Sequence, residues 1–126
     1  LDESDREILE IFLEEAQELQ QELDRVLQEW QDAPENLRAT EEVQRIMHTL
    51  KGGARLADIS SIGDLSHELE TLFEGLTDKR LTADPSLVTL LFSCHDRLAS
   101  IIDDVASGNS GVAATDLISQ IQHIIV

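Results

Sequence analysis

Residues 45–57 of the chain read RIMHTLKGGARLA. The apolar side chains of this stretch recur at intervals of three and four, the spacing of one face of an α-helix, at Ile46, Met47, Leu50 and Ala54. Gly52 and Gly53 do not end the pattern, although two glycines inside a helix cost about 2 kcal/mol relative to alanine. Glycine at such a place indicates that another body comes close to the backbone. The stretch therefore predicts a helix with one face in a core and another face open to contact.

The same spacing predicts four further helices on either side of this one. The predicted helices cover residues 2–30, 37–57, 61–76, 84–105 and 112–125. Leu37 is expected on the apolar stripe of the second helix, and Ser61 with Asp64 is expected to form a capping box at the start of the third. Asp84 followed by Pro85 is a strong start signal for the fourth. Short connections favour antiparallel neighbours. The predicted fold is all-α, an up-and-down antiparallel four-helix bundle with an additional C-terminal helix.

Charge and composition restrict the functions open to the chain. Its 126 residues include 26 acidic and 9 basic side chains, which give a formal net charge of −17. Binding to nucleic acid or to an anionic membrane is disfavoured, because both would repel this surface. There is one cysteine, and no stretch approaches the roughly 18 apolar residues of a membrane span. We expect a single cytoplasmic domain over residues 1–126, cut from a longer protein because it starts at Leu1 without methionine.

Polar residues gather on one face of the second helix. His48, Lys51, Gly52 and Arg55 are spaced so that they share a face beside the core stripe. Arg45, Lys51 and Arg55 place three of the nine cations within eleven residues. This positive spot on an acidic protein suits a phosphoryl group or an acidic pocket of a partner.

The turn between the second and third helices is expected to bring further groups to this face. With Ile59 at the middle of an antiparallel hairpin, His48 lies level with Glu70, and Lys51 lies level with His67. A carboxylate that accepts one ring N–H of a histidine fixes its tautomer and leaves a lone pair on the other nitrogen. Glu70 would thus orient His48 as a nucleophile, Lys51 would steady phosphoryl oxygens, and His67 would support the cluster.

The string His48-Thr49-Leu50-Lys51-Gly52 resembles the core motif of the histidine phosphotransfer (HPt) domains of two-component signalling, His-x-x-Lys-Gly. His67 and Glu70 correspond to the His and Glu that the chemotaxis-kinase branch carries on the next helix. The longer string over residues 45–57 and the acidic opening over residues 7–16 look like the HPt modules of the hybrid chemosensory kinases that control type IV pili and twitching.

The resemblance implies a carrier rather than a catalyst. His48 would accept a phosphoryl group from a histidine kinase domain or a receiver aspartate, and would pass it to a response-regulator receiver domain. The parent would be a multidomain signalling protein, a hybrid histidine kinase. Mg²⁺ and ATP would come from the partner domains, consistent with a chain that has no nucleotide-binding loop of its own. The docking face would include Gly52, Gly53, Arg45 and Arg55.

Other interpretations of these residues remain open. A helical adaptor or dimerisation bundle could keep the HPt fold without phosphoryl transfer. A metal site built from His48, His67 and Glu70 is disfavoured, because the Glu-x-x-His pattern of bundle metal sites would need a glutamate where Arg45 stands. Neighbouring residues on a helix point about 100° apart, so Cys94, His95 and Asp96 cannot converge as a triad. Cys94 is expected in the core, and neither His95 nor His123 has an evident companion.

Overall fold

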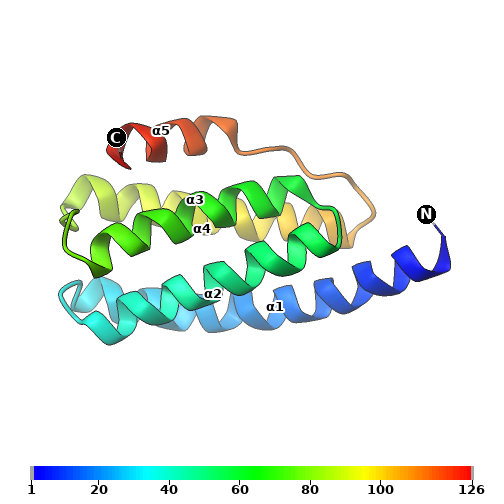
Figure 1. Cartoon of the computed structure of the whole chain (residues 1–126), viewed down its shortest axis with the longest axis horizontal. Helices are drawn as coiled ribbons and strands as arrows, with labels where there is room; N and C mark the ends of the chain where they lie inside the picture. Colours follow the sequence, from blue (N-terminus) through cyan, green and yellow to red (C-terminus); the bar gives the residue numbers. More distant parts are fainter. Residues whose placement is uncertain (1, 126) are drawn as a thin grey trace.

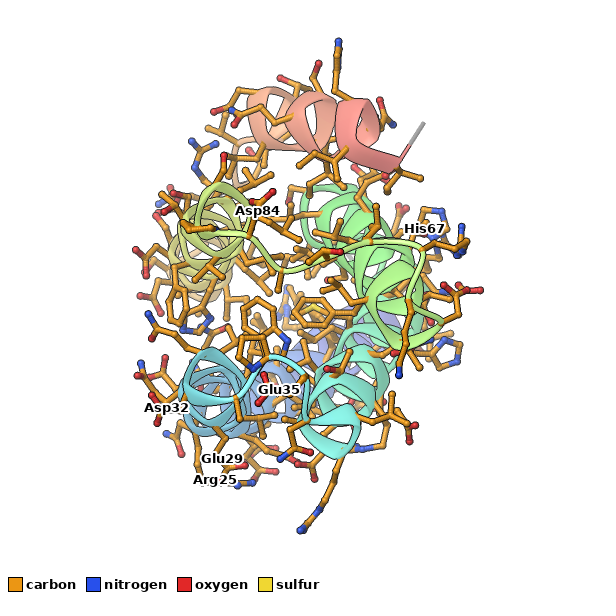
Figure 2. The ribbon with its side chains drawn as sticks, turned by 90° about the vertical axis from the view of Figure 1, so that its left-hand side faces the viewer. Arg25, Glu29, Asp32, Glu35, His67 and Asp84 are labelled. Atoms are coloured by element: carbon orange, nitrogen blue, oxygen red, sulfur yellow. The ribbon has the colours of Figure 1, made fainter. Side chains whose placement is uncertain are left out.

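The protein is described by a computed structural model over residues 2–125. Five helices make up this part of the chain: α1 (Glu3–Asp32), α2 (Leu37–Leu56), α3 (Ser60–Thr77), α4 (Pro85–Ala106) and α5 (Thr115–Ile125). Helices α1 to α4 form an antiparallel bundle in which α4 packs back against α1, while α5 lies outside it against α3 (Figures 1 and 2). Within residues 2–125 no helix is long and apolar enough to cross a membrane. The predicted fold class, with its additional C-terminal helix, is confirmed.

Three of the helices start at a polar side chain that caps them. Asp2, Asn36 and Asp84 accept hydrogen bonds from backbone N–H groups in the first turns of α1, α2 and α4. Such caps satisfy donors that have no partner inside the helix. At α4 the cap is followed by Pro85, whose fixed backbone angle suits the first turn. The start that the sequence predicts for α4 is therefore confirmed.

One apolar core runs through the bundle and reaches under α5. The rings of Trp30 and Phe73, near the C-terminal ends of α1 and α3, meet edge to face in this core, with centroids 5.4 Å apart and planes at 63°. The stripes predicted for α2 and α3 point into this core; their buried members include Val43, Ile46, Met47, Leu50, Ala54, Ile62, Leu65, Leu69, Leu72 and Phe73. Because α2 buries this stripe, its opposite face, which carries His48, is turned to solvent.

Two predictions at helix starts were wrong. Leu37 is the first residue of α2 and is 47% exposed, because the core of α2 begins only at Ala39. The capping box of Ser61 and Asp64 does not form, since α3 begins at Ser60 with Ile59 at the N-cap and no capping side chain. Ile59 is drawn into the core, and Ser61 turns inward with it.

The fifth helix also starts later than the sequence predicts. It begins at Thr115 instead of Val112. Gly111 has a φ of 75°, which interrupts helical geometry, and Val112 is 75% exposed in the connection that follows. The predicted break over residues 107–111 therefore extends to Ala114, which is buried and marks the approach to α5.

Candidate functional site

His48 stands on the solvent-facing side of α2 and is held by a carboxylate of α3. Its side chain is 68% exposed, and its Nδ1 lies 2.6 Å from Glu70 Oε2. An ionised carboxylate only accepts hydrogen bonds, so Nδ1 is the donor and carries the proton. In the neutral ring the lone pair is then on Nε2, to which no residue between 2 and 125 is hydrogen-bonded. The geometry leaves one ring nitrogen fixed and the other free to attack.

Glu70 is the centre of the cluster. Its Oε1 accepts a hydrogen bond from Lys51 Nζ at 2.5 Å, and both side chains are mostly buried. Burial alone would raise the pKa of the Glu70 carboxyl, but hydrogen bonds from Lys51 and His48 outweigh that effect and lower the pKa below its ordinary value. Glu70 is therefore kept as a carboxylate, the form that can accept from both neighbours at once.

The two remaining members of the predicted cluster behave differently. Lys51 was expected level with His67, yet its ammonium reaches Glu70, one helical turn further along α3. His67 is exposed at the outer edge of α3 (Figure 2), and its side chain has no hydrogen-bond partner among residues 2–125. The structure thus joins His48, Glu70 and Lys51 by hydrogen bonds and leaves His67 beside them.

The adjacent glycines have different surroundings. A Cβ atom on Gly52 would meet nothing within 4 Å, so the fold of this chain does not require glycine there. A Cβ atom on Gly53 would lie 2.8 Å from Phe12 Cδ1, closer than carbon atoms pack. Gly53 therefore has a structural reason inside the domain, the close packing of α1 on α2, which the sequence pattern alone did not indicate.

The two arginines predicted at the docking face also differ. Arg45 donates to Glu22 of α1 at 2.7 Å and ties α1 to α2. Arg55 is exposed and forms no ion pair with the residues that the structure describes. Of the positive groups near His48, Arg55 is thus the one whose charge is left unpaired.

A second histidine–carboxylate pair lies on the other side of the bundle and was missed from the sequence. His95 of α4 is buried; its Nε2 is hydrogen-bonded to Asp24 of α1, and its Nδ1 lies 3.1 Å from Gln20 Nε2. The expectation that His95 has no companion was wrong. Its companions lie on a helix more than seventy residues away, where no spacing rule points to them. Because both ring nitrogens are engaged and the ring is covered, His95 is not available as a nucleophile.

Other candidate chemistry is limited within the described part of the chain. Cys94 is fully buried, as expected, and burial raises the pKa of its thiol to about 12. Residues 2–125 contain no group of three or more His, Cys, Asp or Glu side chains placed to hold a metal ion. His48 is therefore the one exposed histidine among residues 2–125 that a carboxylate orients. His123 of α5 is exposed too, but its Nδ1 is held only by the carbonyl oxygen of Ser119, at 3.0 Å.

Comparisons with known proteins identify the family of the chain. The Hpt domain family matches residues 7–108 of the chain. The chemotaxis protein CheA of Listeria monocytogenes is 30% identical over 106 residues, which cover 84% of this chain and 17% of that protein. CheA of Borreliella burgdorferi is 32% identical over 102 residues, 81% of this chain and 12% of the relative. A gliding motility regulatory protein of Myxococcus xanthus is 31% identical over 78 residues, 62% of this chain and 10% of the relative.

The chain therefore spans less than a fifth of the length of these relatives. No solved structure gave a significant match. The family match covers α1 to α4 almost completely and ends two residues after α4, so that α5 lies outside it. The chain belongs to the Hpt domain family, as a histidine phosphotransfer module of a chemotaxis-type phosphorelay.

Proposed function

We propose that Nε2 of His48 is the phosphoacceptor of this module. The observation that carries the proposal is the 2.6 Å hydrogen bond from Nδ1 to Glu70, because it assigns the free lone pair to an exposed nitrogen. In the first step this lone pair attacks the phosphorus of the donor. An N–P bond forms at Nε2, and the P–O bond to the leaving group, either ADP or a receiver aspartate, breaks. In the second step the carboxylate of a receiver aspartate attacks the same phosphorus, and the N–P bond breaks with its electron pair returning to Nε2.

Glu70 and Lys51 act together as positioning residues. The carboxylate holds the Nδ1 proton throughout both steps, so that the ring keeps one orientation and one tautomer. Lys51 in turn holds the carboxylate through its other oxygen. We assign Lys51 mainly to this orienting role. Glu70 neutralises part of the Lys51 charge, and the remaining charge would stabilise the phosphoryl oxygens. We keep His67, which is exposed and lies three residues before Glu70 on α3, as a supporting group.

The docking face extends from His48 toward Gly52 and Arg55. Gly52 supports this assignment, because a glycine in mid-helix costs about 1 kcal/mol of stability relative to alanine and no residue between 2 and 125 fills the space beside it. Arg55 supports it through its unpaired charge. Gly53 and Arg45 contribute indirectly, by packing and tying α1 against α2 at the edge of the face.

The proposed partners follow from the family to which the chain belongs. We propose a histidine kinase domain in the same parent chain as the donor, with ATP and Mg²⁺ bound there, and receiver domains as acceptors. The parent is then a larger cytoplasmic signalling protein, as the small share of the relatives covered by this chain suggests. The likeness to the modules of pilus and twitching kinases, together with a relative that regulates gliding motility, favours surface motility as the output.

The deciding experiment is phosphorylation of the purified domain by kinase domains, by phosphorylated receiver domains and by phosphoramidate, a small phosphoryl donor. We expect a mass gain of one phosphoryl group that is acid-labile and absent from His48→Gln. Phosphorus–nitrogen correlations in NMR spectra should place the group on Nε2. His48→Gln should melt within about 2 °C of the wild type, because the side chain is mostly exposed.

Two results would contradict the proposal. Equal labelling of wild type and His48→Gln would remove His48 from the reaction. Binding of a partner to the α2 face without labelling by any donor would leave the domain a helical adaptor.

A further inference from the structure

Gln44 lies one turn before His48 on the same face of α2, and it is not among the residues that hold the histidine. Residues four apart on a helix have Cβ atoms about 5–6 Å from each other. The side chain of Gln44 is half-buried, and its Oε1 accepts a hydrogen bond from Thr77 Oγ1 of α3 at 3.1 Å. Gln44 and His48 therefore both reach from α2 to α3, two helices that lie side by side and run in opposite directions (Figure 1).

The bond to Thr77 fixes the amide of Gln44 and leaves its donors free. A side-chain amide has one acceptor oxygen and two N–H donors. Thr77 occupies the oxygen, and Nε2 donates to no residue between 2 and 125. Nε2 also reaches the surface, in contrast to the unpaired Nε1 of Trp30, which is enclosed by the core. Gln44 thus presents oriented N–H groups to solvent beside the phosphoacceptor.

Nε2 of His48 is directed toward the turn of α2 that carries Gln44. Glu70 bonds to His48 through Oε2 and to Lys51 through Oε1, so its carboxylate lies between their levels. Nδ1 therefore faces the C-terminal side of the His48 ring, and Nε2, across the ring from it, faces the preceding turn. The side chains of a helix also lean toward its N-terminus, in the same direction. A phosphoryl group on Nε2 would thus extend toward the amide of Gln44.

The cations of α2 lie elsewhere. Lys51 and Arg55 follow His48 along the helix and lie on the Glu70 side of its ring. Arg45, on the preceding turn, is paired with a carboxylate of α1. The turn toward which Nε2 points therefore offers a phosphoryl group a neutral donor instead of a free positive charge.

Two exposed carboxylates flank this position. Glu41 precedes Gln44 by three residues on α2, and Glu74 follows Glu70 by four residues on α3, so each shares the face of its neighbour. A phosphoryl group carries up to about two negative charges and would be repelled by both carboxylates. The N–H groups of Gln44 would offset that repulsion, because hydrogen bonds to a charged acceptor are stronger than those between neutral groups.

We propose that Gln44 is a phosphoryl-binding residue of this module, which donates a hydrogen bond from Nε2 to an oxygen of the phosphoryl group on His48. Thr77 is the residue that positions the amide for this bond. A neutral donor holds the phosphoryl group without an ion pair that would have to be broken when the group leaves for a receiver. This inference rests on the proposed function of His48, because the ligand of Gln44 is the phosphoryl group formed there.

The first test uses the wild-type domain. The nitrogen-labelled domain is phosphorylated with phosphoramidate, and its side-chain amide resonances are followed by NMR. The resonances of Gln44 Nε2–H should move downfield when His48 is labelled, because their donor acquires a charged acceptor. Gln122 is the internal control, since it also contacts α3, through Glu68, but does so from α5. Its resonances should stay in place.

The second test uses variants. Gln44→Leu removes the donors and keeps the size of the side chain. The phosphorus resonance of the phosphohistidine should then titrate about half a pH unit higher, because an N–H donor favours the more negative form of the phosphoryl group. Labelling by phosphoramidate should be about fivefold slower. Thr77→Val should change both quantities in the same direction by about twofold, and Gln122→Leu, the matched control, should behave as the wild type.

Three results would overturn the inference. Gln44 amide resonances that stay in place on labelling would show that the amide does not meet the phosphoryl group. A Gln44→Leu variant that titrates and labels like Gln122→Leu would show that the amide does not act on it. Slower labelling with an unchanged titration would assign Gln44 a purely structural role. A wild type that phosphoramidate does not label would instead refute the proposed function of His48, and this inference with it.

Discussion

The two adjacent glycines of α2 should respond in opposite directions to the same substitution. Gly52→Ala adds a methyl group to open space, whereas Gly53→Ala adds one at 2.8 Å from Phe12 Cδ1 and 3.0 Å from Cε1. Both variants gain the same helix propensity, about 1 kcal/mol. The difference between them therefore measures the contact with Phe12 alone.

The size of that difference follows from the contact distances. Carbon atoms pack at about 3.5 Å or more, so the Phe12 ring must move by about 0.7 Å to admit the methyl group. Phe12 is only 4% exposed, and displacing a packed ring costs about 1–3 kcal/mol. Gly52→Ala should raise the free energy of unfolding by about 1 kcal/mol, and Gly53→Ala should lower it by about 1 kcal/mol. At about 4 °C per kcal/mol the two melting temperatures should lie about 8 °C apart.

The assay is unfolding in urea and by heat, followed by circular dichroism and by the fluorescence of Trp30. Unchanged urea m-values would attribute the shifts to stability. Combining Gly53→Ala with Phe12→Leu provides the control, because a smaller, more flexible side chain should remove most of the penalty. Equal melting temperatures for the two alanine variants would refute the reasoning, since they would mean that the Phe12 ring moves aside at no cost.

Three further predictions concern the site and the fold. The Glu70 pKa lies below its ordinary value of 4.5, so its ionised form stabilises the folded state above that value, and the contribution is lost as the pH falls through the lowered pKa. Glu70→Gln should therefore lower the free energy of unfolding by about 1 kcal/mol at pH 7 and slow phosphorylation of His48, and in urea titrations its difference from the wild type should shrink steadily as the pH falls below 4.5. Gly52→Leu should raise the melting temperature by about 3 °C, because leucine has nearly the helix propensity of alanine, yet it should reduce kcat/KM for transfer to a receiver by about tenfold. Unimpaired transfer would exclude Gly52 from the docking face. Asp84→Ala removes the cap of α4 and should cost about 1 kcal/mol in thermal unfolding, whereas Asp84→Asn should retain most of the stability.

The central contact of the site is predictable because it depends on local geometry. Helical spacing places His48 on the exposed face of α2, and the hairpin turn at Ile59 brings Glu70 to the same level, so that a short chain segment contains the whole pair. The partner of Lys51 is less predictable, since a long flexible side chain can reach a carboxylate one turn away from its expected level.

Contacts between distant segments of the chain cannot be predicted from helical spacing. The packing of Phe12 on Gly53 and the pair of Asp24 with His95 depend on how α1 is seated against its neighbours, which no spacing within one helix specifies. The same holds for Ser61, where a good capping sequence is overridden because Ile59 enters the core. Tertiary burial, rather than local preference, decides these positions.

The burial of Cys94 has a practical consequence for spectroscopy of this domain. A thiol with no exposed surface and a pKa near 12 is almost entirely protonated at pH 7 and does not react with maleimide dyes. A cysteine introduced at an exposed site such as Ser100 of α4 would therefore be the single position to take up a fluorophore, without prior removal of the native residue. The protein can thus carry one dye on α4, a different helix from the one that carries His48, and the arrival and departure of a labelled partner can be followed by energy transfer in a chain whose core is left unaltered.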